Sequence, residues 1–478
     1  MLLLNGSRAC RRALMIVAVL GWLTAAHGQT PATTSPKPPN FVFILVDDLR
    51  WDAMSCMDHP FVKTPNIDRI ATSGVRFANA FVTTSLCAPA RASFLTGTYS
   101  HTNGVRTNEG KDFDPARVPS FAQVLQKAGY ETAFVGKWHM APNANPRPGF
   151  DYWLSFRGQG KYIDPDLNED GRAFKAKGYM TDLLTDSAVE FIKRPRSKPF
   201  SLCLWHKAVH GPFTPADRHA GLYADAALPE PASFRDTFEG KPQWQARRVV
   251  GRRERQAASQ PVATSTVRDT WDGRGQQRLD YFRALAAVDD SVGRVFAALK
   301  ETGALDNTVI LFAGDNGYFH GEHRRGDKRA AYEESIRIPL LMCGPGIAKP
   351  GSVPDPMILN IDVAPTLLDL AGIEPPATMQ GRSFKPILAG AKPDWRSSFF
   401  YAYYKEGWLP AIPTMFGVRT TDWKYVEYPE IDDVDELYDL RRDPHEMHNL
   451  ATAPDAKAQL AAMQAELARL KKETGFTE

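Results

Sequence analysis

Cysteine is scarce in this chain of 478 residues, which holds only five. Cys10 lies close to the N-terminus, and the others, Cys56, Cys87, Cys203 and Cys343, are far apart in the sequence. Small secreted domains that depend on disulfides carry many cysteines at short spacings. The sequence therefore excludes a disulfide-stapled scaffold, and it leaves the pairing of these thiols open.

A strong net charge and long apolar runs are also missing. The formal charge is +3, and it falls to zero (3 − 3 = 0) without Arg8, Arg11 and Arg12 near the N-terminus. A chain without an overall positive field has no general attraction for nucleic acid, so we expect no nucleic-acid partner. Beyond residue 28 no apolar stretch is long enough to span a bilayer, and the sequence has no visible internal repeat.

The first 28 residues have the pattern of a signal peptide. The three arginines precede an apolar run at residues 13–26, and Ala26-His27-Gly28 is a small-x-small cleavage site. The run is too short for a comfortable membrane span. We predict a signal peptide at residues 1–28, a Pro/Thr-rich tether at 29–39, and an exported protein, periplasmic or secreted, without a stable membrane anchor.

Buried strands alternate with helices along most of the chain. Residues 40–46 (NFVFILV) and 308–312 are continuous apolar runs, which is typical of strands buried on both faces of a parallel sheet. Further strands are expected at residues 75–81, 131–135 and 200–205, and helices at 64–74, 121–128, 180–193, 279–302 and 363–371. The pattern predicts an α/β fold with a large mixed, mostly parallel sheet flanked by helices.

The pattern changes after residue 394, where short alternating strands replace the helices. Strands are expected at residues 398–403, 415–420 and 423–428, and an amphipathic helix at 456–472. We therefore predict a main domain at residues 40–394 and a small C-terminal α+β subdomain at 395–478, formed by an antiparallel sheet and a helix.

Residues 85–97 (SLCAPARASFLTG) hold the first candidate for chemistry. Pro89 suits the first turn of a helix, which places Cys87 at the N-terminus, where free N–H groups favour an anion. Arg91 would lie one turn further along on the same face. Taken alone, these residues describe either a nucleophilic cysteine with a lowered pKa or a small buried side chain beside a surface arginine.

Polar residues follow three of the predicted strands, at the sheet edge where α/β proteins place their ligands. These are Asp47-Asp48 after residues 40–46, Lys137 and His139 after residues 131–135, and Asp315-Asn316 after residues 308–312. Adjacent carboxylates repel each other unless a cation neutralises them. Asp47 and Asp48 therefore indicate either a cation site or a pair of helix-capping residues.

The string C-A-P-A-R-A-S-F-L-T-G resembles the signature of the type I, formylglycine-dependent sulfatases of the alkaline phosphatase superfamily. The matching residues are Cys87, Pro89, Arg91, Leu95, Thr96 and Gly97, while Ala90 stands where the family usually has serine. The resemblance implies an alkaline phosphatase-like fold, a catalytic sulfatase domain at residues 40–394, and conversion of Cys87 to formylglycine (3-oxoalanine) by a maturation enzyme.

Other segments resemble the same family in the same order along the chain. They are D-D at residues 47–48, G-K-W-H at 136–139, K-A-V-H-G-P-F at 207–213, G-D-N-G at 314–317 and the C-terminal tag at 436–451. Arg324 stands where the family often has glycine. The resemblance implies one Ca²⁺ ion, with Mg²⁺ as the alternative, held by Asp47, Asp48, Asp315, Asn316 and the modified Cys87.

The resemblance also implies roles around the sulfate group. Its contacts are expected from Arg91, Lys137, His139, His210 and Lys328. Among them, His210 with Lys328 nearby would protonate the departing sugar oxygen, and His139 would help the hydrated formylglycine at position 87 to release sulfate. The expected catalytic set is Cys87, Arg91, His139, His210 and Lys328.

Three classes of function fit these motifs: a glycan exo-sulfatase, a phosphonate or phosphodiester hydrolase, and a non-catalytic binder of sulfated glycans. The complete sulfate clamp disfavours the second class, and the intact Cys87 core disfavours the third. Residues 161–171 and 403–414 look most like bacterial N-acetylglucosamine-6-sulfatases. This likeness implies exo-acting 6-O-desulfation of N-acetylglucosamine in a sulfated carbohydrate, with another carbohydrate or aryl sulfatase as the alternative.

Two further stretches bear on the substrate. Four aromatic residues lie close together in the sequence: Tyr401, Tyr403, Tyr404 and Trp408. Their rings either stack on the sugar of a substrate or pack in the core, which is the commoner use. The arginine-rich residues 234–278 form either a solvated face or a rim contact for a polyanionic glycan.

Overall fold

In a computed structural model, which describes residues 37–246 and 273–477, the first apolar run forms strand β1 (Asn40–Val46). This strand pairs in parallel with β8 (Phe200–Trp205) on one side and with β9 (Thr308–Gly314) on the other. All of its residues are buried, because its side chains point alternately to the two faces of the sheet and both faces are covered. The predicted strand buried on both faces is confirmed.

Within the described residues, nine strands form this central sheet, in the order β2-β10-β9-β1-β8-β4-β5-β6-β7. The pairs from β9 to β5 are parallel, and the pairs at both edges are antiparallel. The other strands are β2 (Gly74–Arg76), β4 (Glu131–Lys137), β5 (Tyr152–Phe156), β6 (Asp166–Glu169), β7 (Arg172–Lys175) and β10 (Leu340–Cys343). The predicted fold class, a mixed and mostly parallel sheet, is confirmed.

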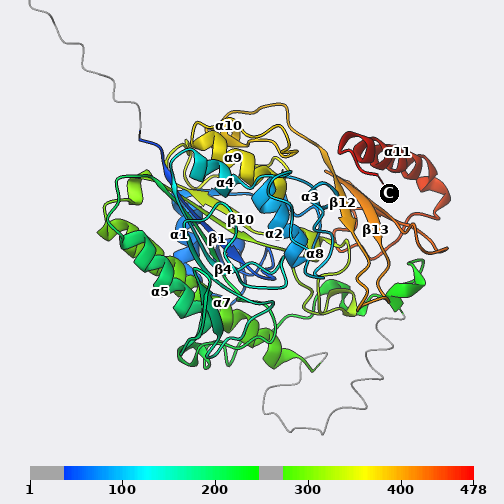
Figure 1. The fold of residues 1–478 in the computed structure, drawn as a ribbon. Coiled ribbons are helices and arrows are strands. Elements are labelled where there is room, and N and C mark those ends of the chain that lie inside the picture. The colour runs from blue at the N-terminus through cyan, green and yellow to red at the C-terminus, as the bar shows by residue number, and fades with distance from the viewer. Residues whose placement is uncertain (1–36, 247–272, 478) are drawn as a thin grey trace, which may run out of the picture. The chain divides into compact units, whose positions relative to one another are not determined.

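Helices cover both faces of the sheet, as Figure 1 shows. Val42 and Ile44 of β1 belong to a core that includes residues of α5 and α7, whereas Phe41 and Phe43 belong to a core with α2, α4 and α9. The α-helices of the described residues are α1 (Pro65–Ser73), α2 (Cys87–Thr96), α3 (Ser100–Asn103), α4 (Phe121–Lys127), α5 (Met180–Lys193), α7 (Gly275–Glu301), α8 (Glu333–Ile336), α9 (Val363–Leu370), α10 (Lys385–Leu388) and α11 (Lys457–Glu473).

The C-terminal part of the chain forms a smaller antiparallel sheet against which α11 packs (Figure 1). Its strands are β12 (Ser398–Tyr403), β13 (Met415–Thr420), β14 (Trp423–Glu427) and β15 (Glu436–Asp439). The Ala402 N–H donates to the Thr83 carbonyl at 3.0 Å, and the Ser85 and Tyr401 hydroxyls are 2.7 Å apart. These bonds attach the smaller sheet to the segment that precedes Cys87. The division of the chain at residue 394 stays a prediction.

The prediction of one strand at residues 75–81 is wrong. The chain forms two short strands there, β2 and β3 (Ala80–Phe81), and they pair with β10 and with β11 (Ile358–Leu359) respectively. Between them, the Ala78 carbonyl accepts hydrogen bonds from the Arg337 guanidinium, and the Asn79 side-chain amide donates to the Asp355 carbonyl at 2.8 Å. At Ala78, therefore, a side chain of another segment bonds the backbone, where the predicted strand would have been bonded by a neighbouring strand.

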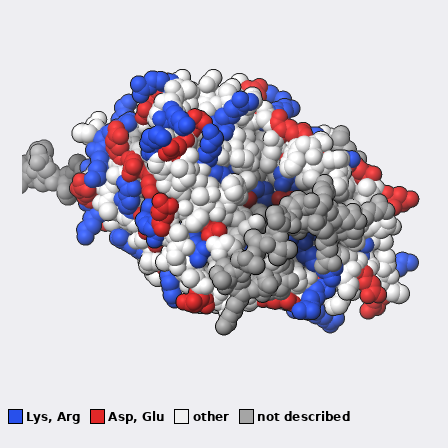
Figure 2. Space-filling view, turned by 90° about the horizontal axis from the view of Figure 1, so that it is seen from below, with Lys and Arg blue, Asp and Glu red and all other residues white. Residues whose placement is uncertain are grey.

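Some sequence predictions fall on residues that the structure does not describe. The signal peptide, most of the tether and the arginines Arg247, Arg248, Arg252, Arg253 and Arg255 lie outside the described ranges. Among the described helices, none combines the length and the apolar character that crossing a bilayer requires. On the face shown in Figure 2, basic and acidic side chains are interspersed, in keeping with a chain of low net charge.

Candidate active site

The register between β1 and β9 brings acidic residues together at one edge of the central sheet. Val46 pairs with Gly314, so Asp47 and Asp315 follow at the same level. The Asp315 N–H donates to the Val46 carbonyl at 3.0 Å, and the Asp48 N–H donates to Asp315 Oδ1 at 2.9 Å. Backbone pairing therefore holds three carboxylates within one buried volume.

Strand β4 delivers a lysine to the same edge. Its Gly136 pairs with Trp205 of β8, and Lys137 is the last residue of the strand. The Lys137 ammonium donates to the Asp47 carboxylate and, at 2.6 Å, to Gln159 Oε1. Lys137 is fully buried, so its charge has no access to solvent and depends on these partners.

Helix α2 begins at Cys87 and has Pro89 as its third residue, as the sequence predicted. One turn further along, Arg91 is fully buried, and its Nη2 lies 2.8 Å from Asp315 Oδ2. Its Nη1 also donates to the Lys137 carbonyl at 2.6 Å. The arginine thus faces an anion, as expected, and in this structure the anion is a carboxylate of the protein.

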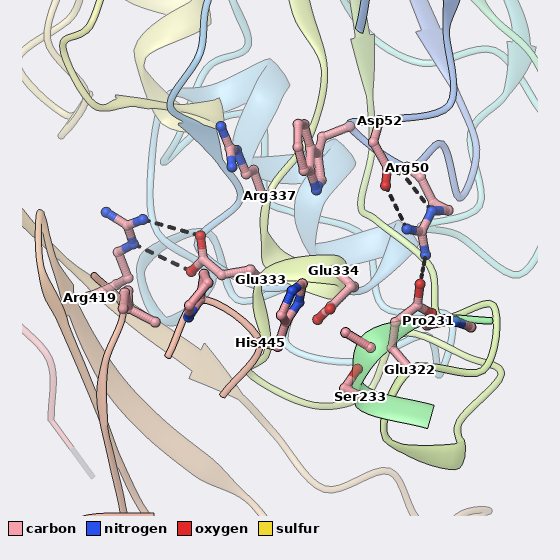
Figure 3. A pocket seen from close by; sticks show the side chains of 14 residues that line it. Arg50, Asp52, Pro231, Ser233, Glu322, Glu333, Glu334, Arg337, Arg419 and His445 are labelled. Carbon is pink, nitrogen blue, oxygen red and sulfur yellow. Dashed lines mark hydrogen bonds and ion pairs between the residues drawn. The ribbon is translucent and has the colours of Figure 1, made fainter. Parts of the chain in front are cut away.

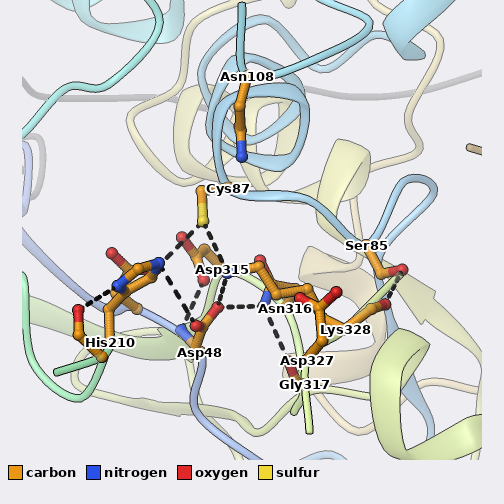
Figure 4. Close-up of polar contacts among 12 residues, drawn as sticks. Asp48, Ser85, Cys87, Asn108, His210, Asp315, Asn316, Gly317, Asp327 and Lys328 are labelled. Carbon is orange, nitrogen blue, oxygen red and sulfur yellow. Dashed lines mark hydrogen bonds and ion pairs between the residues drawn. The ribbon is translucent and has the colours of Figure 1, made fainter. Parts of the chain in front are cut away.

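Lys328 completes the cluster from the loop after β9. Its Nζ lies 2.5 Å from Asp48 Oδ1 and 3.3 Å from Cys87 Sγ, and the same sulfur lies 3.3 Å from Asp47 Oδ1 (Figure 4). Each of the three carboxylates therefore has a cationic side chain as its shortest charged contact, and Asp47 Oδ2 also lies 3.6 Å from Arg91 Nη2. The pairs are Asp47 with Lys137, Asp48 with Lys328, and Asp315 with Arg91.

The cysteine does not have the lowered pKa that its helix position indicated. Burial and the charge of Asp47 raise the pKa of the Cys87 thiol to about 12, although Lys137 and Lys328 act in the opposite direction. Of the two alternatives for these residues, the structure disfavours the cysteine with a lowered pKa, because an adjacent carboxylate and full burial outweigh the helix N-terminus. The other alternative fits the buried Cys87 side chain, but Arg91 is buried and does not lie at the surface. An unmodified Cys87 is a protonated thiol at neutral pH.

The oxygen atoms of the cluster fit a hard divalent cation. Carboxylate oxygens of Asp47 and Asp48, the Cys87 sulfur and a ring nitrogen of His210 lie within 4.8 Å of one another. This group adds His210 to the predicted ligands and does not contain Asp315. Burial and the Asp47 charge raise the pKa of Asp315 to about 7, because neighbouring carboxylates resist ionising together. Within the described residues, the buried Asn316 Oδ1 has no hydrogen-bond partner. A cation that prefers oxygen ligands would satisfy both groups.

The histidines differ in how they are held. His210 lies beside the cluster, with its Nδ1 2.8 Å from the Gly211 carbonyl and its Nε2 3.7 Å from Asp48 Oδ2. Burial lowers the pKa of His210 to about 4. His139 is half-buried in a left-handed conformation (φ 64°). His206, by contrast, is fully buried with its Nε2 3.1 Å from the Ser291 hydroxyl.

Three residues near the cluster were missed in the sequence. Gln159 bonds Lys137, and Asn108 Oδ1 accepts from the Ala88 N–H at 2.9 Å, but both lie in loops without a motif. Lys207 is the first residue of the K-A-V-H segment, and this motif could have identified it as a site residue. Its Nζ lies 4.5 Å from the ring centroid of Tyr162, and burial together with the charge of Lys137 lowers its pKa to about 8.

The four aromatic residues of the C-terminal part separate into two kinds. Tyr401 and Tyr403 are buried in the core around the smaller sheet, and Tyr404 is half-buried. Trp408 is exposed. Packing therefore explains the two buried tyrosines, and only Trp408 presents a largely open ring.

A separate cavity of about 410 Å³ contains none of the predicted site residues. Figure 3 shows its charged lining, in which Arg419 pairs with Glu333 at 3.1 Å and Arg50 with Glu322 at 2.8 Å. These two ion pairs lie within the lining, and the cavity is separate from the strand-end cluster.

Comparison with known proteins connects the strand-end cluster to a family. Residues 39–373 match the family described as sulfatase, and residues 321–473 match the family described as N-sulphoglucosamine sulphohydrolase, C-terminal. The chain belongs to the sulfatase family. The predicted family and the predicted enzyme class, a sulfuric ester hydrolase, are confirmed.

This sulfatase is 36% identical to N-acetylglucosamine-6-O-sulfatase of Bacteroides thetaiotaomicron, covering 95% of this chain and 89% of the relative. It is 31% identical to N-acetylglucosamine-6-sulfatase of Homo sapiens, with coverage of 94% and 86%. A solved structure of a protein in complex with its substrate D-glucosamine-2-N,6-O-disulfate has a TM-score of 0.81 and 34% identity, with coverage of 92% and 98%.

Glycine at position 136 of the sulfatase is required by backbone contact. Gly136 has a φ of 131°, and a Cβ atom there would lie 1.9 Å from the Trp205 carbonyl oxygen. Any other residue must therefore push β4 away from β8, and Lys137 moves with the strand. The glycine of G-K-W-H thus fixes the position of the lysine that follows it.

We expect Gly136→Ala to lower both the melting temperature and kcat/KM for an aryl sulfate, because the clash displaces Lys137. Gly129→Ala is the matched control, since Gly129 also has a positive φ (94°) but nothing lies within 4 Å of its added Cβ. The control should lose about 1–2 kcal/mol of stability from backbone strain and keep its activity. Equal behaviour of the two variants would contradict the packing argument.

Proposed function

We propose that this sulfatase removes the 6-O-sulfate from terminal N-acetylglucosamine in sulfated glycans. The observation that carries the proposal is the alignment, at 36% identity over 95% of the chain, with N-acetylglucosamine-6-O-sulfatase of Bacteroides thetaiotaomicron. The similar solved structure, whose bound substrate carries a 6-O-sulfate on glucosamine, supports the same substrate class.

The proposal includes two groups that the sulfatase family generally uses. Cys87 is converted to formylglycine, and one Ca²⁺ or Mg²⁺ ion is held by Asp47, Asp48, Asp315, Asn316 and the converted residue. When present, the hydrated aldehyde supplies an oxygen nucleophile and the ion supplies positive charge beside it. Two observations support a bound cation: within the described residues Asn316 Oδ1 has no hydrogen-bond partner, and the pKa of Asp315 is raised.

Arg91, Lys137 and Lys328 bind the oxygens of the sulfate group in this proposal. All three are buried, and their nitrogen atoms contact the Asp315, Asp47 and Asp48 carboxylates respectively. Figure 4 shows Lys328 beside Cys87 and Asp48. Hydrogen bonds from a charged donor to a charged acceptor are stronger than neutral ones, and burial increases their strength further. His139 and His210 line the same volume and complete the contacts to the ester.

Proton transfer falls to His210 and His139. The His210 imidazole is neutral at pH 7 because burial lowers its pKa, but the negative charge of a bound ester favours its protonated form. His210, with the Lys328 ammonium nearby, then gives a proton to the departing sugar oxygen. His139 takes a proton from residue 87 when sulfate is released. Its Nδ1 is buried and, within the described residues, has no hydrogen-bond partner.

The proposal also includes export and a maturation enzyme as partner. Residues 1–28 carry the signal-peptide pattern, and export gives the enzyme access to extracellular or periplasmic glycans. A mature protein that begins after residue 28 supports export, whereas an intact N-terminus in an exported fraction contradicts cleavage at this point.

We expect mass spectrometry of the peptide that contains Cys87 to show formylglycine in any active preparation. The Cys87→Ala variant should fold normally and lose all turnover, because the change removes the nucleophile and only a small part of the packing. Unmodified thiol throughout a fully active preparation would rule out this role for Cys87.

Asp315→Asn should reduce bound calcium and activity together, because it removes one negative charge from the ligand set. Metal content is measured by elemental analysis, and Asp369→Asn serves as the control because Asp369 pairs with Lys385 away from the site. Full activity after exhaustive chelation would show that no metal takes part.

A panel of singly sulfated sugars tests the substrate. We expect kcat/KM, followed by release of free sulfate, to be highest for 6-sulfo-N-acetylglucosamine. A clear preference for 4-sulfo-N-acetylgalactosamine or a 2-sulfated uronate would overturn the glycan assignment and leave the sulfatase chemistry in place. Faster hydrolysis of an aryl phosphonate ester than of any sulfate ester would contradict the proposed reaction itself.

A further inference from the structure

Trp408 is unusual because a large apolar side chain is exposed close to the candidate site. Its side chain is 61% exposed, the highest value among the exposed large apolar residues of the described chain. It lies in the loop that joins β12 to β13. An isolated exposed apolar residue is common and carries no argument by itself. The argument for Trp408 rests on how its ring is held and on what its loop is connected to.

The indole of Trp408 is fixed by two buried partners. Its Nε1–H donates to Glu406 Oε1 at 3.2 Å, and the Arg329 guanidinium carbon lies 4.9 Å from its ring centroid. Glu406 is fully buried and Arg329 nearly so. Because the ring is held at its edge and covered by Arg329, it keeps one orientation, and a ligand that stacks on it does not have to order it first.

The loop of Trp408 is connected to the candidate site from two sides. Arg329 directly follows Lys328, whose Nζ contacts Cys87 Sγ. From the other side, the Gly407 N–H donates to Glu109 Oε1 at 2.6 Å, next to the Asn108 side chain that bonds the start of α2. Figure 4 shows Asn108 and Lys328 on different sides of Cys87. The exposed ring therefore belongs to the rim of the site.

The partners of Arg329 exclude a second anion site as the explanation. Arg329 Nη1 lies 2.8 Å from Asp327 Oδ1, and its Nε donates to the Glu406 carboxylate. Two carboxylates thus match one guanidinium charge, which leaves no excess positive charge for a further sulfate or a uronate. What Trp408 itself offers a ligand is the flat apolar face of an indole.

We propose that Trp408 stacks on a pyranose ring of the substrate and is a specificity-determining residue of this sulfatase. The C–H groups on one face of a pyranose are apolar, and indole rings with a hydrogen-bonded edge suit such surfaces. This inference rests on the proposed glycan substrate, and it adds the residue that recognises the sugar as distinct from the sulfate. The Arg329–Glu406 pair acts as a positioning element for the ring.

The test compares Trp408→Ala, Trp408→Phe and the wild type on 6-sulfo-N-acetylglucosamine. For Trp408→Ala we expect KM to rise about tenfold with kcat within about twofold, because the contact stabilises the bound ground state and the transition state alike. Trp408→Phe should recover part of the loss. The inhibition constant of inorganic sulfate should stay within about twofold in all variants, because sulfate alone does not reach the rim.

Phe174→Ala is the matched control, since Phe174 is another exposed aromatic side chain (39%) on strand β7. It should leave both KM and the sulfate inhibition constant unchanged. An unchanged KM in Trp408→Ala, or a parallel loss of sulfate inhibition, would overturn the inference while the proposed function stands. A wild-type enzyme that cleaves no sulfated sugar, yet cleaves aryl sulfates, would overturn both.

Discussion

Three carboxylates and three cationic side chains share one buried volume at the carboxyl ends of β1, β4 and β9. None of Asp47, Asp48, Asp315, Arg91, Lys137 and Lys328 is more than 3% exposed. Removing one member of a buried ion pair lowers the free energy of unfolding by about 3–5 kcal/mol, because the charge of its partner is left buried and uncompensated. The formal charges of the six groups sum to zero, and this balance constrains both folding and chemistry.

The charge balance depends on backbone geometry that extends through the central sheet. The register of β1 with β9 sets Asp47 level with Asp315, and the close approach of Gly136 to Trp205 sets the position of Lys137. Helix α2 then brings Cys87 and Arg91 to the same point. The smaller sheet contributes through bonds to the segment before Cys87 and through the loop of Trp408, so both parts of the chain shape one site.

Much of this arrangement could be predicted from the sequence. The bounds of α5, β8, β12 and β13 agree with the apolar patterns. The acidic residues were correctly expected at one edge of the sheet, because they follow the carboxyl ends of parallel strands. The break between β2 and β3 was missed because Arg337, far along the chain, takes the place of a strand partner at Ala78. The sequence left two alternatives open for Cys87 for a similar reason, since the raised pKa of its thiol depends on burial against Asp47. Loop residues such as Gln159 and Asn108 carry no pattern, and only the fold reveals them.

Because the six charges cancel, the account makes sulfate binding depend on an added cation. A divalent ion on the carboxylates gives the cluster a net charge of about +2, which favours a sulfate anion in a buried site. The most direct test is calorimetric titration of the purified enzyme with inorganic sulfate, with Ca²⁺ present and after chelation. We predict that chelation weakens the sulfate affinity by at least about tenfold, or about 1.4 kcal/mol. Equal affinity in the two conditions would contradict the account, because Arg91, Lys137 and Lys328 would then bind sulfate while still paired with their carboxylates.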